Sequence, residues 1–305
     1  MAMPLAVGVA RTSAPPAQRY CTDAAGPSRV ESQVPAARPA ALVFVHLSKA
    51  GGSSLKNVLV KQAAREHEEP PVLLWRLTWP ALLEDCRRAS PTMCNRSLYM
   101  GTGSYGACDV VMRRPCRYFT QLREPIARMQ SHYSYFCVAG AEGRKGWDPG
   151  WRRCELSLEG WAARHRLQTL LALTQPFASV PTRNGTRASP GPGHCNCTGA
   201  GCAAPWQEEA LLNEAKRSIR TGAMVALVLE EPAESARLLL QRLQLDLSGS
   251  GLLGAVHINS HGNHSASSAR DIHGSLVPSL SALLRHEIAL YEYARGHLLN
   301  STAGP

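Results

Sequence analysis

The chain has 305 residues, enough for one large α/β domain or two small ones with a substantial hydrophobic core. Its hydrophobic fraction of 44% is ordinary for a globular protein, and no apolar run reaches the roughly 18 residues that a membrane-spanning helix needs. The net charge of +10 favours an acidic partner (nucleic acid, a membrane surface or an acidic polysaccharide), unless it reflects only arginine-rich coding.

The predicted elements alternate between short buried strands and amphipathic helices. Residues 1–38 are rich in Ala, Pro, Ser and Arg without periodicity, so we expect a disordered leader or stalk there. Residues 39–305 form the predicted domain, with a Pro-, Gly- and Cys-rich surface insertion at 175–205. Strands are expected at 42–45, 72–75, 98–100, 118–122 and 224–229, and helices at about 53–64, 80–88, 125–136, 156–173, 206–220, 232–243 and 277–299. The alternation predicts an α/β, P-loop-like three-layer fold, in which a central parallel sheet carries helices on both faces.

The asparagines indicate the compartment better than the cysteines do. Five of the eight asparagines lie in N-x-[ST] sequons, which favours a glycosylating, secretory-pathway lumen. The sequons are at Asn95, Asn184, Asn196, Asn263 and Asn300. Ten cysteines permit disulfides there, although sequence alone does not give their pairing. The group His194, Cys195, Cys197 and Cys202 resembles a zinc site, but its irregular spacing favours a disulfide-bearing surface loop.

The segment from Leu42 to Leu55 predicts an anion site. A buried strand is followed by Gly51 and Gly52, which allow close backbone approach, and then by a helix that Ser53 or Ser54 is able to cap. Free N–H groups at the helix start attract an anion, and Lys49 adds a positive charge. The nucleotide triphosphatase pattern G-x-x-x-x-G-K-[ST] is absent, because Lys49 precedes both glycines. A purely structural turn is the alternative.

A second motif follows the strand at 118–122. Arg123 stands at the carboxyl end of this strand, where open α/β sheets bind ligands, and Ser131 lies about two turns into the next helix. An arginine fork and a serine hydroxyl together suit a second phosphate. The two motifs predict a nucleotide that carries phosphate at both its 5′ and its 3′ end.

These motifs resemble those of the Golgi carbohydrate sulfotransferases, most closely the branch of the heparan sulfate 2-O- and 6-O-sulfotransferases. The segment from Phe44 to Ser54 is similar to F-V-H-I-x-K-T-G-G-T-[ST], and the segment from Tyr118 to Tyr133 is similar to Y-F-T-x-L-R-[DE]-P-x-x-R-x-x-S-x-Y. Weaker similarities lie at Val256–Asn259 and Leu290–Ala294. The likeness spans about residues 40–300 and is strong in two places.

The resemblance implies a donor, 3′-phosphoadenosine 5′-phosphosulfate, and no metal. It implies that the 5′-phosphosulfate is held by Lys49, Ala50, Gly51, Gly52, Ser53 and Ser54, and the 3′-phosphate by Arg123 and Ser131. Lys49 would also stabilise the charge that develops on the leaving oxygen. The acceptor is expected to be a hydroxyl of an anionic or neutral polysaccharide, and the lumenal sequons argue against nucleic acid.

His46 is the predicted catalytic base, because an imidazole with an ordinary pKa near 6.5 accepts a proton at neutral pH. Its alternative role is that of an oriented core histidine at a strand end. Two departures from the family pattern bear on activity: Ala50 replaces a threonine, and Thr102 stands where many relatives carry a histidine. Further basic residues are candidates for a glycan groove, namely Arg113, Arg114, Arg117, Arg144, Lys145, Arg152 and Arg153. His257, His261 and His264 suggest a metal only weakly, because they lie in a Ser/Gly loop.

We therefore expect a sulfotransferase of the Golgi lumen. A membrane anchor is expected for the family but is not seen in this chain. If the gene model is truncated, we expect the full protein to be anchored in the membrane as a type II protein. The alternatives are a non-catalytic glycan-binding relative of the same fold and, less favoured, a P-loop nucleotide kinase.

Overall fold

The computed structural model describes residues 40–65, 70–74, 79–88, 90–111, 116–138, 156–175, 205–243 and 274–302. All of them belong to one compact unit. The expected leader and most of the expected insertion at 175–205 lie outside the described residues.

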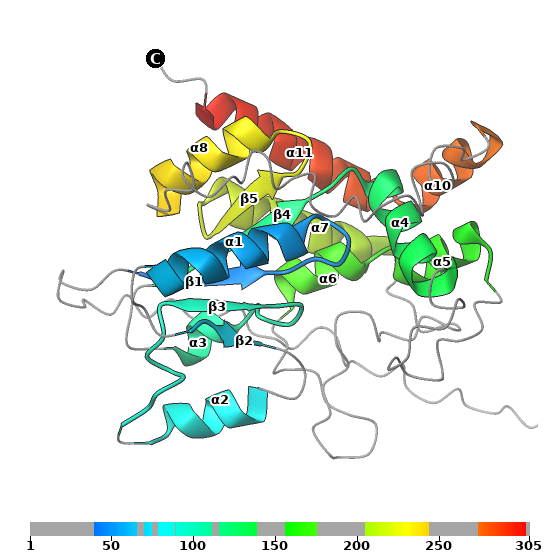
Figure 1. The fold of residues 1–305 in the computed structure, drawn as a ribbon. Helices are drawn as coiled ribbons and strands as arrows, with labels where there is room; N and C mark the ends of the chain where they lie inside the picture. The colour runs from blue at the N-terminus through cyan, green and yellow to red at the C-terminus, as the bar shows by residue number, and fades with distance from the viewer. Residues whose placement is uncertain are drawn as a thin grey trace, which may run out of the picture. The chain divides into compact units, whose positions relative to one another are not determined.

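Five strands of the described chain form one all-parallel sheet in the order β2-β3-β1-β4-β5 (Figure 1). The strands are β1 (Ala41–Val45), β2 (Val72–Leu73), β3 (Leu98–Gly101), β4 (Cys116–Leu122) and β5 (Met224–Val228). β1, the first strand, occupies the middle of the sheet. The predicted α/β fold with a central parallel sheet is confirmed.

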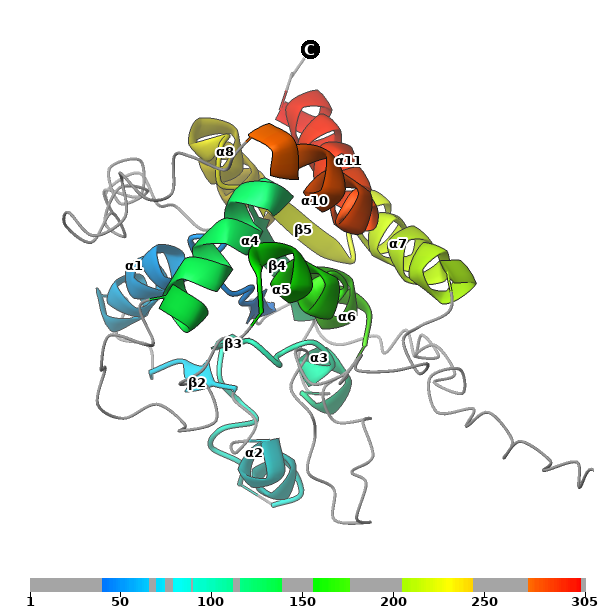
Figure 2. The ribbon, with the colours of Figure 1, turned by 90° about the vertical axis from the view of Figure 1, so that its right-hand side faces the viewer.

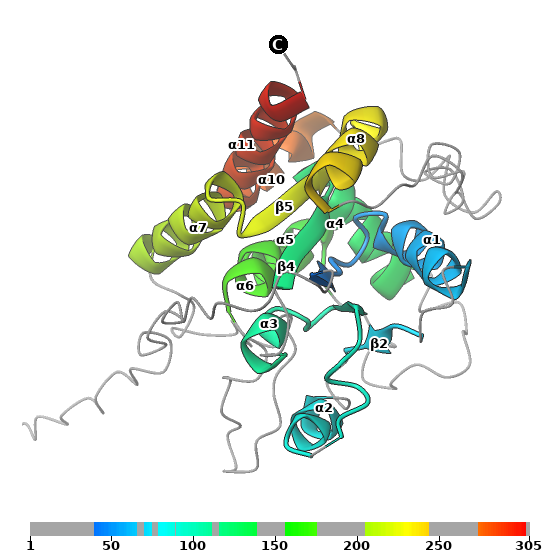
Figure 3. The same ribbon diagram turned by 90° about the vertical axis from the view of Figure 1, so that its left-hand side faces the viewer.

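Helices cover both faces of the sheet. The helices are α1 (Gly52–Arg65), α2 (Trp79–Cys86), α3 (Ala107–Val110), α4 (Pro125–Tyr133), α5 (Leu158–His165), α6 (Gln168–Thr174), α7 (Pro205–Arg220), α8 (Pro232–Leu243), α10 (Val277–Leu283) and α11 (Arg285–Thr302). Figures 2 and 3, taken from opposite sides, show α1 and α8 on one side of β4 and β5 and α6 and α7 on the other.

The alternation of side chains along β1 explains the two layers. Phe44 points to the face that α1 and α8 cover, where it stacks on Phe119 of β4. Val45 points to the opposite face and packs with α6 and α7. Successive residues of a strand face opposite sides, so a strand that is buried on both faces must be apolar throughout. Residues 41–45 fit that requirement, and this is why the strand was predictable.

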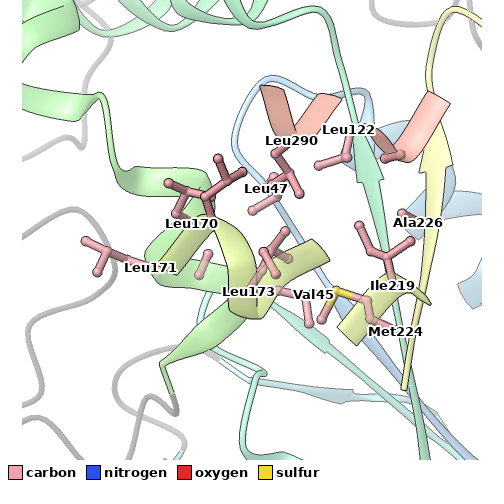
Figure 4. Close-up of a cluster of buried hydrophobic side chains, with 14 of the residues drawn as sticks. Val45, Leu47, Leu122, Leu170, Leu171, Leu173, Ile219, Met224, Ala226 and Leu290 are labelled. Atoms are coloured by element: carbon pink, nitrogen blue, oxygen red, sulfur yellow. The ribbon is translucent and has the colours of Figure 1, made fainter. Parts of the chain in front are cut away.

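Figure 4 shows the cluster on the α6 and α7 face, directly beneath the turn that leaves β1. Leu47 and the fully buried Ala50 belong to this cluster, so the start of the turn is anchored in the core. The cluster also includes Val45, Leu122, Leu170, Leu171, Leu173, Ile219, Met224, Ala226 and Leu290. Because Leu47 and Ala50 are packed in the core, the turn between β1 and α1 can keep a fixed backbone conformation.

Several helix boundaries differ from the sequence prediction. The expected helix at 156–173 is divided into α5 and α6 at Arg166 and Leu167. The side chain of Arg166 forms an ion pair of 2.8 Å with Glu208 of α7, whereas Leu167 is buried in the core. The expected helix at 277–299 is divided at the buried Leu284. The expected helix at 125–136 ends at Tyr133, and a π-helical segment, η1 (Ser134–Val138), continues it. The short α3 was not predicted.

The described residues contain disulfides, which the cysteine count permitted without indicating the pairs. Cys86 pairs with Cys94 and Cys108 pairs with Cys116, and Cys137 is disulfide-bonded as well. Every cysteine within the described ranges is therefore oxidised, which agrees with an oxidising compartment.

Candidate functional site

The two sequence motifs lie on either side of the point where the sheet topology changes direction. From β1 the chain runs outward through α1 to β2 and β3, and from β3 it crosses to β4 and β5 on the other side of β1. Open α/β sheets bind ligands at such a switch point, outside the carboxyl ends of the strands. The turn after β1 carries Lys49, and the residue after β4 is Arg123.

The turn after β1 has an unusual backbone. Lys49 has φ of 65° and Gly51 has φ of 77°, both in the left-handed region. For a residue with a side chain this conformation costs about 1–2 kcal/mol, and such strain collects at ligand-binding sites. Left-handed residues that alternate with right-handed ones turn successive N–H groups towards one point, which forms a concave anion site.

Three backbone donors at this turn have no acceptor within the described part of the chain. The first bonds of α1 run from the N–H groups of Ser54 and Leu55 to the carbonyl of Gly51. The N–H groups of Gly51, Gly52 and Ser53 donate to none of the described residues. They stand at the positive end of the helix dipole, which is where an anion is bound most favourably. Since α1 begins at Gly52, neither Ser53 nor Ser54 is its N-cap, contrary to expectation.

The side chain of Lys49 reaches towards η1. Its Nζ lies 4.2 Å from the centre of the Tyr135 ring, within the range of a cation–π contact. Burial is the main cause of the lowered pKa of His132 in α4, and the charge of Lys49 makes the smallest of several contributions to it. π-Helical segments are often found at functional sites, and here one supplies the ring that holds the lysine.

Arg123 connects the second motif to the first. Its Nη1 donates to the carbonyl oxygen of Lys49 at 3.2 Å. Burial lowers the pKa of this guanidinium, and the nearby carboxylates of Glu230 and Glu124 oppose that shift. An arginine remains charged in such surroundings. The guanidinium of Arg123, which follows β4, therefore lies against the turn that carries Lys49 after β1.

The imidazole of His46 packs against the first residue of α1. A Cβ built on Gly52 would lie 2.1 Å from Cδ2 and 2.6 Å from Nε2 of His46, so any other residue at this position would force the imidazole to move. Nε2 consequently faces the end of the helix that carries the free N–H groups. Burial, with a smaller contribution from Lys56, lowers the pKa of His46 to about 4, well below the value of 6.5 assumed from sequence. His46 is therefore neutral at pH 7.

His46 lies in a row across three strands. The printed register pairs Val45 with Gly101 of β3 and with Thr120 of β4, and the N–H of His46 donates to the carbonyl of Gly101 at 2.9 Å. One position further along, the register sets His46 between Thr102 and Gln121. Position 102, where the motif pattern that the chain resembles has a histidine, is thus the neighbour of His46. A histidine at either position reaches the same edge of the sheet.

Most of the second motif has structural partners. The hydroxyl of Tyr118 accepts from the N–H groups of Gly106 and Cys108 at 2.9 Å each, and Thr120 donates to the carbonyl of Val45 at 2.8 Å. Arg128 forms a buried ion pair of 2.6 Å with Glu287 of α11. The hydroxyl of Tyr133 donates to the carbonyl of Leu156 at 3.2 Å. These four residues position α4 and β4, which leaves Arg123 and Ser131 for a ligand.

The other predicted donor-binding residues occupy different surroundings. Ser131 lies in α4, and its hydroxyl makes no hydrogen bond with the described residues. Ser53 is exposed and Ser54 is buried. The side chain of Ala50 is fully buried in the core, and its N–H donates to the carbonyl of Leu47. A threonine at position 50 would therefore have to place its side chain in the core.

The remaining sequence candidates are mostly outside the described residues. This holds for the histidines at 257, 261 and 264, for the group at 194–202, and for all the expected groove arginines and lysine except Arg117. Arg117 is exposed and donates to the carbonyl of Arg242. Among the described residues there is no group of three His, Cys, Asp or Glu side chains that could hold a metal.

Three residues at or near the site were not singled out from the sequence. Tyr135 contacts Lys49, Gln121 lies beside the turn, and Glu287 holds Arg128. Periodicity offered no signal for Tyr135, because a π-helix shifts the face that it presents. Gln121 is one of several polar residues in β4, with Arg117 and Thr120, so the composition of the strand did not single it out.

No helix among the described residues is long and apolar enough to cross a membrane. No protein-family model matches this chain, and a comparison with curated proteins likewise finds no match.

Proposed function

We propose that this protein transfers a sulfuryl group from 3′-phosphoadenosine 5′-phosphosulfate to a hydroxyl of a glycan, in particular a glycosaminoglycan-like polysaccharide. The observation that carries the proposal is the 3.2 Å hydrogen bond from Arg123 to the carbonyl of Lys49. It joins the two anion-binding motifs at the switch point of the sheet. A nucleotide with phosphates at both ends requires two such groups next to each other.

The turn after β1 suits the 5′-phosphosulfate. The N–H groups of Gly51, Gly52 and Ser53 are without acceptors among the described residues, and the positive end of the α1 dipole adds to their attraction for an anion. Lys49 supplies a mobile charge beside them. Arg123 and the Ser131 hydroxyl are left for the 3′-phosphate.

The reaction is an in-line displacement at sulfur. The bond between sulfur and the bridging phosphate oxygen breaks, and its electron pair stays on the phosphate of the product, 3′,5′-adenosine bisphosphate. The acceptor oxygen forms a new bond to sulfur and gives its proton to Nε2 of His46. Lys49 and the free N–H groups stabilise the charge that develops on the leaving oxygen.

His46 is suited to this role by its position more than by its basicity. Nε2 faces the start of α1, close to where the sulfuryl group would lie. A pKa of about 4 keeps the imidazole unprotonated, and hence able to accept a proton, throughout the neutral and mildly acidic range. Binding of an anionic donor beside it would raise the pKa of His46 and strengthen it as a base.

The disulfides support placement in the secretory pathway, and we propose the Golgi lumen as the site of action. The donor, the acceptor polysaccharide and the type II membrane anchor that the resemblance implies belong to the same proposal. Neither nucleic acid nor a resident metal is part of it.

The test is transfer of labelled sulfate from the donor to a panel of glycans, with the wild type beside His46→Ala and Lys49→Ala. We expect the rate of sulfate transfer to fall by about 100-fold or more in both variants. Both variants should be folded as the wild type is in the absence of the donor. A folded wild type that fails to bind the donor would overturn the proposal. Donor binding without transfer to any glycan would favour the non-catalytic glycan-binding alternative, and turnover of a nucleoside triphosphate would favour the kinase alternative.

A further inference from the structure

Lys49 is held at both its backbone and the tip of its side chain. Its carbonyl oxygen accepts a hydrogen bond from Arg123 at 3.2 Å, and its Nζ lies 4.2 Å from the centre of the Tyr135 ring. The backbone of Lys49 has φ of 65°, in the left-handed region. A long side chain loses conformational entropy when it is ordered, so its ordering needs a partner that stabilises it. Here that partner is an aromatic ring.

The ring of Tyr135 is itself held by neighbouring rings. It meets Phe136 edge to face, with ring centres 5.0 Å apart and planes at 85°, and Phe136 stacks on Trp161 of α5 at 6.4 Å. These are favourable arrangements of aromatic rings. The indole N–H of Trp161 donates to Nδ1 of His132 in α4 at 2.8 Å, and Cys137 of η1 is disulfide-bonded. The segment η1 is therefore anchored, and Tyr135 offers Lys49 a ring in a fixed place.

The ammonium group of Lys49 lies between the two anion-binding motifs. Tyr135 follows Ser131 by about one helical turn, on the continuous segment formed by α4 and η1. Arg123, two residues before the start of α4, contacts the backbone of Lys49. The side chain of Lys49 therefore runs from the turn after β1 to the segment that carries the second motif.

An aromatic ring differs from a carboxylate as a partner of lysine. A carboxylate would cancel the positive charge and compete with an incoming anion, whereas a ring attracts the ammonium group through its quadrupole and leaves the charge in place. An ammonium group has three N–H donors, so those that are not directed at the ring remain available to a ligand. Tyr135 thus orders the cation without neutralising it.

We propose that Tyr135 is the positioning residue of Lys49: its ring fixes the ammonium group in the place from which it stabilises the charge on the oxygen that leaves sulfur. The catalytic meaning of this inference rests on the proposed sulfuryl transfer, but the contact between ring and ammonium group does not. Tyr135 touches neither donor nor acceptor in this role. An ammonium group that is already in place needs no ordering in the transition state, so its effect appears in kcat.

The first experiment reads the contact directly, by NMR of the full chain labelled with ¹³C-lysine. The chain has five lysines, and Lys49→Arg assigns the signal of Lys49. Protons over the face of an aromatic ring are shifted upfield, so the ε-methylene protons of Lys49 should resonate upfield of those of the exposed Lys61. Tyr135→Leu should abolish this upfield shift, and Tyr135→Phe should retain it.

An ordinary shift of Lys49 in the wild type, or an upfield shift that Tyr135→Leu leaves unchanged, overturns the inference. Thermal unfolding of each variant ensures that only folded proteins are compared. If Tyr135→Leu does not fold, Tyr135→Met takes its place, because the flexible methionine side chain fills irregular spaces without supplying a ring.

The second experiment measures sulfate transfer. Tyr135→Leu should lower kcat by about 10-fold, as expected for a desolvated cation–π contact, while KM for the donor stays near the wild-type value. Tyr135→Phe should keep the wild-type kcat. In the background of Lys49→Ala, Tyr135→Leu should have no further effect, because the ring acts only through the ammonium group. Tyr293→Leu is the matched control: the ring of Tyr293 in α11 lies 5.7 Å from Nζ of Lys216, and its loss should leave kcat unchanged.

The two experiments separate failure of this inference from failure of the proposed function. If no glycan is sulfated but Lys49 shows the ring-dependent shift, the contact stands and only the proposed reaction fails. If sulfate is transferred and Tyr135→Leu keeps the wild-type kcat, or lowers kcat equally in the background of Lys49→Ala, the positioning role is wrong. A rise of kcat in Tyr135→Leu would mean that the ring holds Lys49 away from the donor, which also overturns the inference.

Discussion

Gly52 and His46 lie in direct contact: the ring edge of His46 that bears Cδ2 and Nε2 occupies the space where any other residue at position 52 would carry its Cβ, only 2.1 Å from Cδ2. The first residue of the helix and the proposed base are therefore fitted to each other. The same glycine lets the backbone approach a ligand and admits the imidazole.

Gly52→Ala should displace the imidazole of His46 and lower kcat by about 100-fold, the loss expected when a general base is misplaced. Affinity for 3′,5′-adenosine bisphosphate should change far less, because the N–H of residue 52 is retained. Steady-state kinetics and calorimetry measure the two effects. Gly296→Ala is the control, since a Cβ there meets nothing within 4 Å. Equal losses of kcat and of nucleotide affinity would contradict this account.

Lys49 combines a functional side chain with a strained backbone, and two substitutions separate these. Lys49→Ala and Lys49→Gly should both lose transfer by about 100-fold, because each removes the ammonium group. Lys49→Gly should be the more stable of the two by about 1 kcal/mol, because glycine adopts φ of 65° without strain. Denaturant unfolding measures the difference. Equal stabilities would mean that the left-handed conformation costs the protein nothing.

Arg123 should confer the preference for a 3′-phosphate. The wild type should bind 3′,5′-adenosine bisphosphate more tightly than adenosine 5′-monophosphate, and Arg123→Ala should reduce that preference by about 10–100-fold, as expected for a lost charge-assisted contact. Calorimetric titration of both nucleotides checks this. Arg220→Ala, an exposed arginine of α7, serves as control. If Arg123→Ala weakens the binding of both nucleotides equally, Arg123 contacts the 5′-phosphate or stabilises the turn, and the assignment to the 3′-phosphate is wrong.

The Arg128–Glu287 pair should be structural. Both side chains are almost fully buried, with exposures of 3% and 2%, and Glu287 also accepts from the N–H of Thr169 at 3.0 Å. Removing one partner leaves a buried charge, so Arg128→Met or Glu287→Met should each cost about 3–5 kcal/mol of unfolding free energy. The double variant should cost clearly less than the sum, which chemical denaturation of all four proteins determines. Additive losses would show that the two residues act independently.

The pH dependence of kcat/KM should report the lowered pKa of His46. The base acts unprotonated, so activity should persist as pH falls below 6.5 and be lost only as pH passes through about 4. The acid limb of kcat should lie at higher pH than that of kcat/KM, because the bound anionic donor raises the pKa of His46. Initial rates between pH 4 and 8, with stability checked at each pH, provide the measurement. An acid limb of kcat/KM near 6.5 would contradict the buried environment of His46.

The order of strands and helices was predictable because hydrophobic periodicity is a local property. The apolar run at 41–45 and the stripe of Leu55, Val58 and Leu59 identify a buried strand and the helix that covers it. Pro125 marked the start of α4, and the structure adds that Glu124 caps it by accepting from the N–H groups of Ile126 and Ala127. The breaks at Arg166 and Leu284 were missed, since the partners that decide them come from distant helices.

The sequence by itself determined the fold class, the glycine-rich turn after the first strand and the identity of the charged residues that follow two strands. Only the tertiary structure decided which of these residues meet. The strand order puts β4 beside β1, and this brings Arg123 to Lys49 and Gln121 next to His46. It also turned Arg128 into a buried structural ion pair and lowered the pKa of His46. The physical reason is that pairing, burial and desolvation depend on residues that are distant in the chain, as in the bond between Arg123 and Lys49, which are more than seventy residues apart. Periodicity and turn chemistry depend only on the nearest few residues in the sequence.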